Sequence, residues 1–306
     1  MKVLRTPDER FSDLPGYDFS PRYLEVPSGD GARLRVHYID EGPGGASETI
    51  VLLHGEPSWS YLYRSMIPPL TAAGFRVVAP DLVGFGRSDK PADRTEYTYA
   101  RHVEWIRAAL FDQLDLADIS LVGQDWGGLI GLRLVAEHPD RFRRVVAANT
   151  GLPTGDMDMG EAFMAWQRFS QDVPELPVGR IVAGGCTSSM SEEVVAAYDA
   201  PFPDETYKEG ARQFPLLVPT RPDDPAGDAN RRAWAVLKRF DKPFLCAYSD
   251  ADPLTRGADA LFLSSVPGTR GETHPTITGA GHFLQEDSGP ALAGAVIEFV
   301  GQNPAA

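Results

Sequence analysis

Cysteine is scarce in this sequence of 306 residues, which contains only Cys186 and Cys246. Two cysteines cannot form a disulfide framework, and neither has His or Cys neighbours at a spacing typical of metal sites. Long apolar runs are missing as well, since no window approaches the roughly 18 consecutive apolar residues that a membrane span requires. Residues 1–10 also lack the apolar stretch of a signal peptide. We therefore expect a cytoplasmic protein with neither disulfides nor a metal site.

Positive charge is in deficit, with 29 Lys and Arg against 43 Asp and Glu and a formal net charge of −14. A surface this acidic repels phosphate backbones and anionic lipids, so neither nucleic acid nor a membrane is expected as a partner. The hydrophobic fraction of 42% is ordinary for a globular protein. This fraction excludes a disordered chain.

Short apolar runs alternate with helical patterns along most of the chain, which indicates a mostly parallel sheet with helices on both faces. The predicted buried strands are residues 48–54, 75–81, 119–124, 142–149, 243–249 and, more weakly, 273–278. Residues 22–27 and 32–40 alternate apolar and polar side chains, which predicts an antiparallel pair at one edge of the sheet. Helical spacing covers residues 97–114, 126–138 and 291–300.

Residues 152–230 break this alternation, because they contain no strand-like run and are rich in Pro, Asp and Met. Two pieces of this region, 160–169 and 191–198, have helical character. A structureless loop of this length is improbable. We therefore predict a helical cap over the carboxyl edge of the sheet, where open α/β sheets bind ligands. The core domain would comprise residues 1–151 and 231–306.

The segment Gly123-Gln124-Asp125-Trp126-Gly127-Gly128 follows a predicted strand and opens a predicted helix. It has the form of a nucleophile elbow, a sharp strand-to-helix turn that exposes one reactive side chain. The flanking glycines allow the backbone to approach where a Cβ would clash. Asp125 stands where esterases carry serine. The alternative is a glycine-rich helix start with Asp125 as a cap, although a cap needs neither flanking glycines nor a preceding buried strand.

Candidate partners for Asp125 follow the last two predicted strands. His282 lies in Ala280-Gly281-His282-Phe283, where the base of a catalytic triad would sit, and the alternative is a loop histidine. Asp252 follows the preceding strand and could orient His282. Asp250 competes for that role, and either aspartate could instead serve a turn. The chain order of nucleophile, acid and base is that of α/β-hydrolases.

His54-Gly55-Glu56-Pro57 stands at the end of the first buried strand. In the α/β-hydrolase fold, one backbone N–H of the oxyanion hole comes from such a loop and the other from the residue after the nucleophile. We assign these two donors to Glu56 and Trp126. The alternative for the loop is a plain turn.

Four segments resemble the haloalkane dehalogenases: HGEPSWSYLYR at 54–64, PDLVGFGRSDKP at 80–91, GQDWGG at 123–128 and AGHFLQE at 280–286. The resemblance extends from about residue 23 to residue 300 and is weakest inside the cap. Epoxide hydrolases share His-Gly-x-Pro and Gly-x-Asp-Trp-Gly. HGEP together with a cap tryptophan, here Trp166, resembles the subgroup of dehalogenases that acts on short haloalkanes.

The resemblance implies an α/β-hydrolase fold and hydrolysis of a haloalkane to a primary alcohol, a halide and a proton. A carboxylate can displace a leaving group at saturated carbon, so Asp125 would form an alkyl ester. His282 would activate the water that hydrolyses this ester, and Asp252 would hold the imidazole. The indole N–H groups of Trp126 and Trp166 would bind the halide. We expect no cofactor and a monomer.

Other functions use the same segments. An epoxide hydrolase would need an acid for the opening alkoxide, which Tyr198 and Tyr207 could supply. A pair of cap arginines, Arg168 and Arg180, would suit fluoroacetate-type substrates, but the elbow lacks the accompanying arginine. A ligand receptor without turnover is the remaining alternative, although an intact triad argues against it. The other tryptophans, Trp59, Trp105 and Trp234, are interpreted as packing residues.

Overall fold

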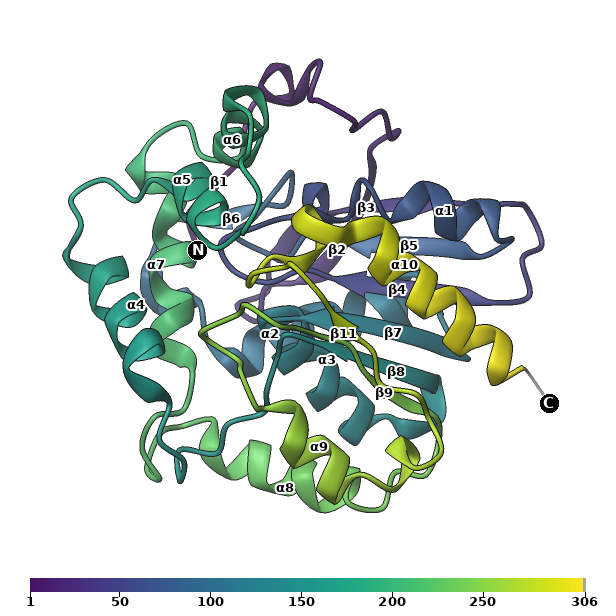
Figure 1. Cartoon of the computed structure of the whole chain (residues 1–306). Coiled ribbons are helices and arrows are strands. Elements are labelled where there is room, and N and C mark those ends of the chain that lie inside the picture. The colour runs from purple at the N-terminus through teal and green to yellow at the C-terminus, as the bar shows by residue number, and fades with distance from the viewer. Residues whose placement is uncertain (305–306) are drawn as a thin grey trace.

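Runs of β-branched residues and leucine form the centre of the structure. The computed structural model describes residues 1–304 and contains a seven-stranded sheet with the order β2-β3-β5-β4-β7-β8-β9 (Figure 1). These strands are β2 (Arg22–Pro27), β3 (Arg33–Glu41), β4 (Thr49–Leu53), β5 (Arg76–Pro80), β7 (Ile119–Gln124), β8 (Phe142–Ala148) and β9 (Phe244–Cys246). Strands β5, β4, β7, β8 and β9 are parallel, whereas β2 and β3 are antiparallel at one edge. The predicted sheet is confirmed.

The predicted strand at 243–249 is divided in the structure. β9 ends at Cys246, whose backbone N–H donates to the side chain of His274 at 3.0 Å instead of to another strand. β10 (Tyr248–Ser249) then pairs in parallel with β11 (Thr276–Ile277) in a separate two-stranded sheet. β1 (Val3–Leu4) and β6 (Lys90–Pro91) form a second short pair. β11 lies within the weakly predicted strand 273–278, which is therefore outside the main sheet. β1 and β6 were not predicted, because strands of two residues carry too little apolar pattern.

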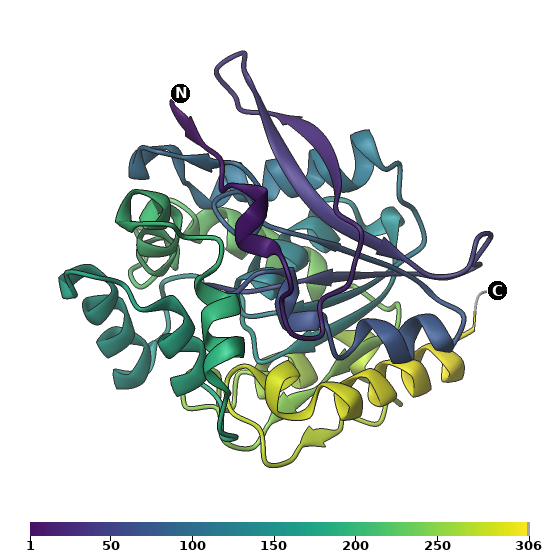
Figure 2. The same cartoon turned by 90° about the horizontal axis from the view of Figure 1, so that it is seen from above.

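Helices cover both faces of the sheet (Figure 2). α1 (Ile67–Ala72) packs against α10 (Leu284–Gln302), and α3 (Trp126–Glu137) packs against both α2 (Tyr99–Arg107) and α8 (Gly227–Leu237). α9 (Asp259–Ser265) contacts β9. None of the helices that the structure describes is both long enough and apolar enough to cross a bilayer.

Two predicted helices differ in extent from the observed ones. α2 stops at Arg107 and continues as a π-helical turn over Ala108–Gln113. α10 begins at Leu284, seven residues before its predicted start, and is interrupted at Ser288, where φ is −146° and ψ is 37°. This interruption precedes Pro290, which cannot donate a helical hydrogen bond. Because the helix is interrupted here, the apolar periodicity of its later turns does not extend to its first turn, which was not predicted.

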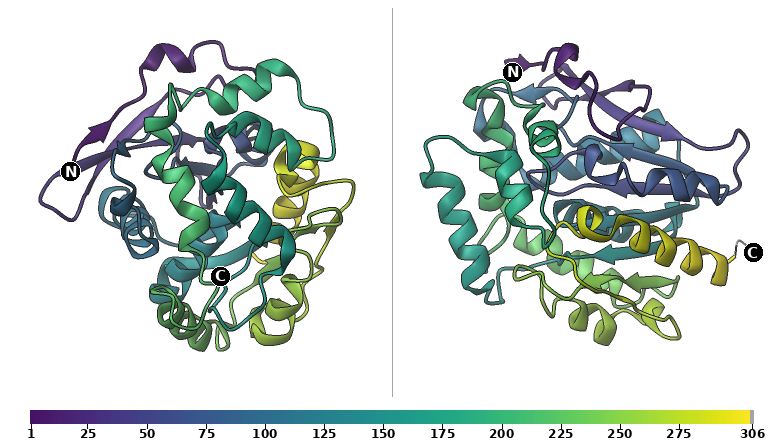
Figure 3. Two further views of the ribbon diagram at one scale, coloured as in Figure 1. Left: turned by 90° about the vertical axis from the view of Figure 1, so that its left-hand side faces the viewer. Right: turned by 45° about the horizontal axis from the view of Figure 1, so that its top comes forward.

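The cap contains α4 (Gly160–Asp172), α5 (Val178–Gly184), α6 (Glu192–Asp199) and α7 (Glu209–Leu217), and Figure 3 (left) looks onto these helices. The two predicted helical pieces correspond to α4 and α6. The predicted boundary at residue 230 falls inside α8. Asn230 is buried there, donates to the carbonyl of Pro153 at 2.7 Å and accepts from Arg133 of α3. We therefore propose a division into core and cap as predicted, except that the cap ends before α8 and not at residue 230.

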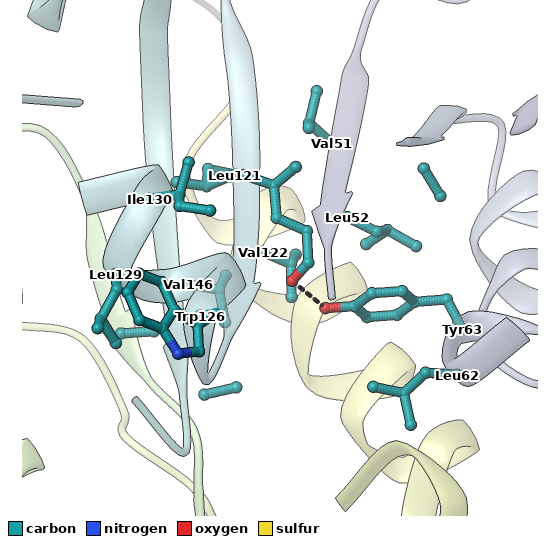
Figure 4. Packing of buried hydrophobic residues seen from close by; sticks show 14 of the residues in the cluster. Val51, Leu52, Leu62, Tyr63, Leu121, Val122, Trp126, Leu129, Ile130 and Val146 are labelled. Carbon is teal, nitrogen blue, oxygen red and sulfur yellow. Dashed lines mark hydrogen bonds between the residues drawn. The ribbon is translucent and has the colours of Figure 1, made fainter. Parts of the chain in front are cut away.

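Around β4 and β7, the core is packed from both faces. Figure 4 shows Val51 and Leu52 of β4 beside Leu121 and Val122 of β7, all of them buried. The hydroxyl of Tyr63 donates to the carbonyl of Leu53 at 2.8 Å. This packing fixes the ends of β4 and β7, after which the segments that contain Glu56 and Asp125 begin.

A buried charged cluster joins the cap to the core. Arg64 forms a bidentate pair with Glu286 at the start of α10, and its Nη2 lies 2.8 Å from Oε2. The same carboxylate accepts a hydrogen bond from Tyr198 of α6. The guanidinium group also lies 4.0 Å from the ring centre of Tyr61. Three segments that are far apart in sequence are thereby held together.

Glu286→Ala should lower the free energy of unfolding by about 3 kcal/mol, because it leaves Arg64 as an unpaired charge in a largely buried site. Urea denaturation measures this loss. Glu298→Ala is a matched control, since Glu298 is an exposed carboxylate on the same helix. The control should change stability by no more than about 0.5 kcal/mol. Equal losses in the two variants would contradict the role of the cluster.

Candidate active site

Asp125 occupies a strained turn between β7 and α3. Its φ of 51° lies in a region that side chains other than glycine rarely adopt, at a cost of order 1–3 kcal/mol. Two hydrogen bonds hold it: its N–H donates to the carbonyl of Asn149 at 3.0 Å, and its carbonyl accepts from the hydroxyl of Thr150 at 2.7 Å. A Cβ on Gly127 would lie 1.9 Å from the carbonyl oxygen of Leu53, so only glycine fits there.

The carboxylate of Asp125 faces the end of β4. Its Oδ1 accepts a hydrogen bond from the backbone N–H of Glu56 at 2.7 Å. The second predicted donor, Trp126, is the first residue of α3. The backbone N–H groups in the first turn of a helix have no partner within the helix. That N–H is therefore available to an oxygen of the neighbouring residue.

His282 lies between the two aspartates. Its Nδ1 is 3.0 Å from Asp252 Oδ2, and its Nε2 is 3.6 Å from Asp125 Oδ2. Asp252 is buried and accepts further hydrogen bonds from the N–H of Leu254 and the hydroxyl of Thr255. Asp250 instead accepts from the backbone of the turn at Gly279. The structure thus brings Asp252, rather than Asp250, against the imidazole.

Charge and burial act in opposite directions on the pKa values of His282 and Asp252. Burial would lower the pKa of His282, but the carboxylates of Asp252 and Asp125 outweigh it and raise this pKa to about 10. Burial would raise the pKa of Asp252, yet the charge of His282 and its hydrogen bond lower it. The pKa of Glu56 is raised well above its usual value by burial and by the charge of Asp125. Both effects favour the neutral form of Glu56.

A cavity of about 770 Å³ opens over Asp125 and His282. Core and cap both line it, and the apolar part of the lining includes Leu129, Leu152, Phe163, Ile181, Val218 and Leu261. Trp126 and Trp166 also face it. Within residues 1–304, no group of three or more His, Cys, Asp or Glu side chains is arranged to hold a metal ion.

The tryptophans differ in whether their indole N–H is free. The N–H of Trp59 donates to Ala197 at 3.2 Å, and that of Trp234 donates to Leu152 at 2.8 Å. Trp105 packs against buried aromatic rings and does not line the cavity. Among the described residues, the N–H groups of Trp126 and Trp166 have no protein acceptor. These two are the tryptophans that combine a free N–H with a place in the cavity wall.

The ring of Trp126 is held from two sides. Tyr99 of α2 contacts it edge-on at 4.9 Å, and Phe214 of α7 contacts it edge-on at 4.6 Å, both measured between ring centres. Such arrangements are favourable for aromatic pairs. Figure 4 shows the Trp126 ring beside Leu129 and Ile130. The orientation of this indole therefore depends on the cap as well as on the core.

The residues considered for other functions lie elsewhere. Tyr198 is buried and bonded to Glu286, and neither it nor Tyr207 belongs to the cavity wall within the part of the chain described. Arg168 and Arg180 are exposed, and Arg180 pairs with Glu192 on the surface. The cavity therefore lacks the tyrosine pair and the arginine pair that those functions would use.

Sequence reasoning missed two amides that contact His282. The side chains of Gln124, at the end of β7, and Asn149, directly after β8, each donate to the carbonyl of His282 at 3.1 Å. Their positions were a usable signal, because polar residues at the carboxyl ends of parallel strands often face the site.

The cap also contacts the loop that carries His282. The backbone N–H of His282 donates to the carbonyl of Gly185 at 2.7 Å. Asp287 accepts hydrogen bonds from the N–H groups of Gly281, Thr187 and Ser188. The residues after α5 and the loop of His282 are thus bonded at several points.

Stability should depend on pH through His282. Its pKa is raised from 6.5 to about 10 on folding, so its stabilising effect is complete below about pH 6.5 and is lost as the pH rises through 10. We expect the difference in unfolding free energy between the wild type and His282→Gln to shrink by about 1 kcal/mol or more from about pH 6 to about pH 10. Urea denaturation at several pH values measures it. A difference that widens over this interval would refute the assignment.

Known proteins support this geometry at the level of the family. The model of the alpha/beta hydrolase fold family matches residues 48–288. A haloalkane dehalogenase from Psychrobacter cryohalolentis is 60% identical, with 99% of this chain and 100% of the relative covered. Another from Mycobacterium marinum is 54% identical, with 98% and 100% covered.

A solved structure, the tetrameric haloalkane dehalogenase DpaA from Paraglaciecola agarilytica, has a TM-score of 0.87 and 39% identity and covers 99% of this chain and 98% of its own. Because that relative is a tetramer, the expectation of a monomer has no support. The sequence, fold and site agree, and the chain belongs to the haloalkane dehalogenases, hydrolases of the carbon–halogen bond with the α/β-hydrolase fold.

Proposed function

We propose that this chain hydrolyses short haloalkanes to a primary alcohol, a halide and a proton through an ester on Asp125. The observation that most supports this is the distance of 3.6 Å between the Asp125 carboxylate and the buried His282, in a largely apolar cavity that two free indole N–H groups face. Neither step of the reaction requires a metal or an organic cofactor. A cytoplasmic location stays a prediction from the sequence.

In the first step, Asp125 attacks the carbon that bears the halogen. We assign the attack to Oδ2, because Oδ1 is held by the N–H of Glu56. The new bond joins Oδ2 to carbon while the carbon–halogen bond breaks and the halide leaves with the electron pair. The product is a neutral alkyl ester. The negative charge passes from the carboxylate to the halide.

In the second step, water attacks Cγ of the ester and His282 Nε2 takes the proton. The backbone N–H groups of Glu56 and Trp126 would stabilise the oxyanion on Oδ1, at about 3 kcal/mol for each donor. Collapse of the intermediate breaks the bond from Cγ to Oδ2, and the alkoxide takes the hydroxyl proton of the intermediate and leaves as the alcohol. The carboxylate is restored, and the imidazolium releases its proton to solvent. Esterification removes the charge of Asp125, which is one cause of the raised pKa of His282. The pKa of the imidazole thus falls at the stage that needs a base.

The halide leaves toward the indoles of Trp126 and Trp166. An indole N–H donates and cannot accept, which suits an anion. An ionised Glu56 would repel a halide in this cavity. Its raised pKa keeps the carboxyl group neutral and removes that objection.

Epoxide hydrolysis is less well supported. It would need an acid for the opening alkoxide, and the cavity wall, as far as the structure describes it, contains no tyrosine. The same Asp125 and His282 could otherwise serve both reactions. A comparison of haloalkane and epoxide substrates therefore discriminates between the two functions.

Incubation with 1-bromobutane or 1,2-dibromoethane should release bromide without added metal or nucleotide, and Asp125→Asn should lower the rate by at least about 10⁴-fold because it removes the nucleophile. Ion chromatography measures the bromide. In His282→Phe, the ester should form and persist, seen as added mass on the peptide that contains Asp125. Styrene oxide turnover without bromide release would favour the epoxide hydrolase instead.

Trp166→Phe should weaken bromide binding by about tenfold or more, because one hydrogen bond to an anion is lost. Quenching of tryptophan fluorescence measures the affinity. Trp234→Phe is the matched control, since Trp234 also lines the cavity but its N–H is bonded to Leu152. If the two variants bind bromide equally well, Trp166 is not a halide ligand.

A further inference from the structure

Gln124 is a fully buried polar residue that the reaction steps above do not use. It ends β7, directly before Asp125, and none of its side chain reaches solvent. Its amide nitrogen lies 3.1 Å from the carbonyl oxygen of His282 and 3.3 Å from Nε2 of the same imidazole. Its amide oxygen is buried and has no partner among the described residues.

The carbonyl of His282 fixes which end of this amide faces the ring. A carbonyl oxygen only accepts hydrogen bonds, so the NH₂ group of Gln124, and not its oxygen, must face it. The reverse orientation would place two acceptors 3.1 Å apart. The same NH₂ group is therefore the one next to Nε2.

A donor at this position affects the two charge states of His282 differently. Nδ1 faces Asp252 and carries a proton, so the neutral ring presents a lone pair on Nε2. The N–H of Gln124 is compatible with this lone pair but would oppose the N–H of an imidazolium. A hydrogen bond to the neutral form of a base lowers its pKa.

Gln124 thus acts against the other groups around the ring. Asp252 and Asp125 both favour the imidazolium, whereas burial and the charge of Asp125 raise the pKa of Glu56 and favour its neutral form. From the cap, the carbonyl of Gly185 accepts a hydrogen bond from the backbone N–H of His282. A base that is held protonated cannot take a proton from water. Among these neighbours, Gln124 is the one that favours the unprotonated ring.

We propose that Gln124 is a positioning residue for the hydrolysis of the ester, which keeps Nε2 of His282 unprotonated and directed toward Asp125. The inference rests on the proposed function, because it concerns the second step of that reaction. It assigns no contact with the substrate to Gln124.

Asn149 provides a matched control. Its amide donates to the same carbonyl of His282 at 3.1 Å, to the carbonyl of Gly281 at 2.9 Å and to the hydroxyl of Ser249 at 2.8 Å, and its oxygen accepts from the N–H of Ser249, but it has no hydrogen bond to the imidazole. Its φ of 38° is accessible to glycine, so Asn149→Gly removes the amide without adding backbone strain. A variant of Asn149 therefore removes support from the His282 loop and from Ser249 but removes no hydrogen bond to the imidazole.

The experiment compares Gln124→Leu and Gln124→Met with Asn149→Gly in single turnovers of 1-bromobutane, from about pH 6 to about pH 10. Bromide reports ester formation and butanol reports ester hydrolysis. In both Gln124 variants, the midpoint of the pH profile for hydrolysis should rise by about one unit. The variants lose the hydrogen bond to the neutral ring, and a bond of ordinary strength corresponds to a pKa change of about one unit. Near neutral pH, hydrolysis should slow by up to about tenfold, while ester formation is unchanged. Asn149→Gly should keep the wild-type midpoint.

An NMR titration of His282 makes the test independent of turnover. In the Asp125→Asn background, adding Gln124→Leu should raise the pKa of the ring by a similar amount. Unshifted midpoints in both Gln124 variants, or an equal shift in Asn149→Gly, would overturn the inference. If the wild type releases no bromide from any haloalkane, the proposed function fails, and the titration still decides the role of Gln124.

Discussion

The site depends on one strained peptide unit. Asp125 can present its carboxylate to the cavity only because its backbone adopts a positive φ at the junction of β7 and α3. That conformation is unfavourable by itself, and the surrounding structure must hold it. The junction passes so close to β4 that a Cβ on Gly127 would lie 1.9 Å from the carbonyl oxygen of Leu53, which only glycine avoids. Asn149 and Thr150, at the end of the neighbouring strand, bond both sides of the turn.

Around this turn, the ionisable side chains form a chain in which each one shifts the pKa of the next. Asp252 is buried with a lowered pKa, and His282 lies between two carboxylates. Burial and the charge of Asp125 raise the pKa of Glu56 and favour its neutral form. In the proposed reaction, the charge of Asp125 disappears when the ester forms. The loss of this charge changes the basicity of the imidazole. One covalent step thereby prepares the group that acts in the next.

Most of the fold could be predicted from the sequence, because buried parallel strands leave continuous apolar runs such as the one that became β7. The three proposed triad residues and both indoles were found from motifs and resemblance. Contacts that depend on three-dimensional approach were not predictable. The amide of Gln124 reaches His282 only because β7 ends beside the loop after β11. The apolar periodicity did not reveal the π-helical end of α2, the break at Ser288 or the extent of α8.

The hydrogen bond from His282 to Gly185 has a consequence for substrate traffic. The cap segment after α5 is hydrogen-bonded to the loop that contains His282. A movement of this segment away from the core would therefore displace the imidazole from Asp125. Opening the cavity to substrate on that side would therefore break these hydrogen bonds and disturb the catalytic geometry. Met157 and Arg256 also border the cavity, are exposed, and take no part in the hydrogen bonds between the cap and the loop of His282. A substrate entrance beside them would leave the imidazole in place.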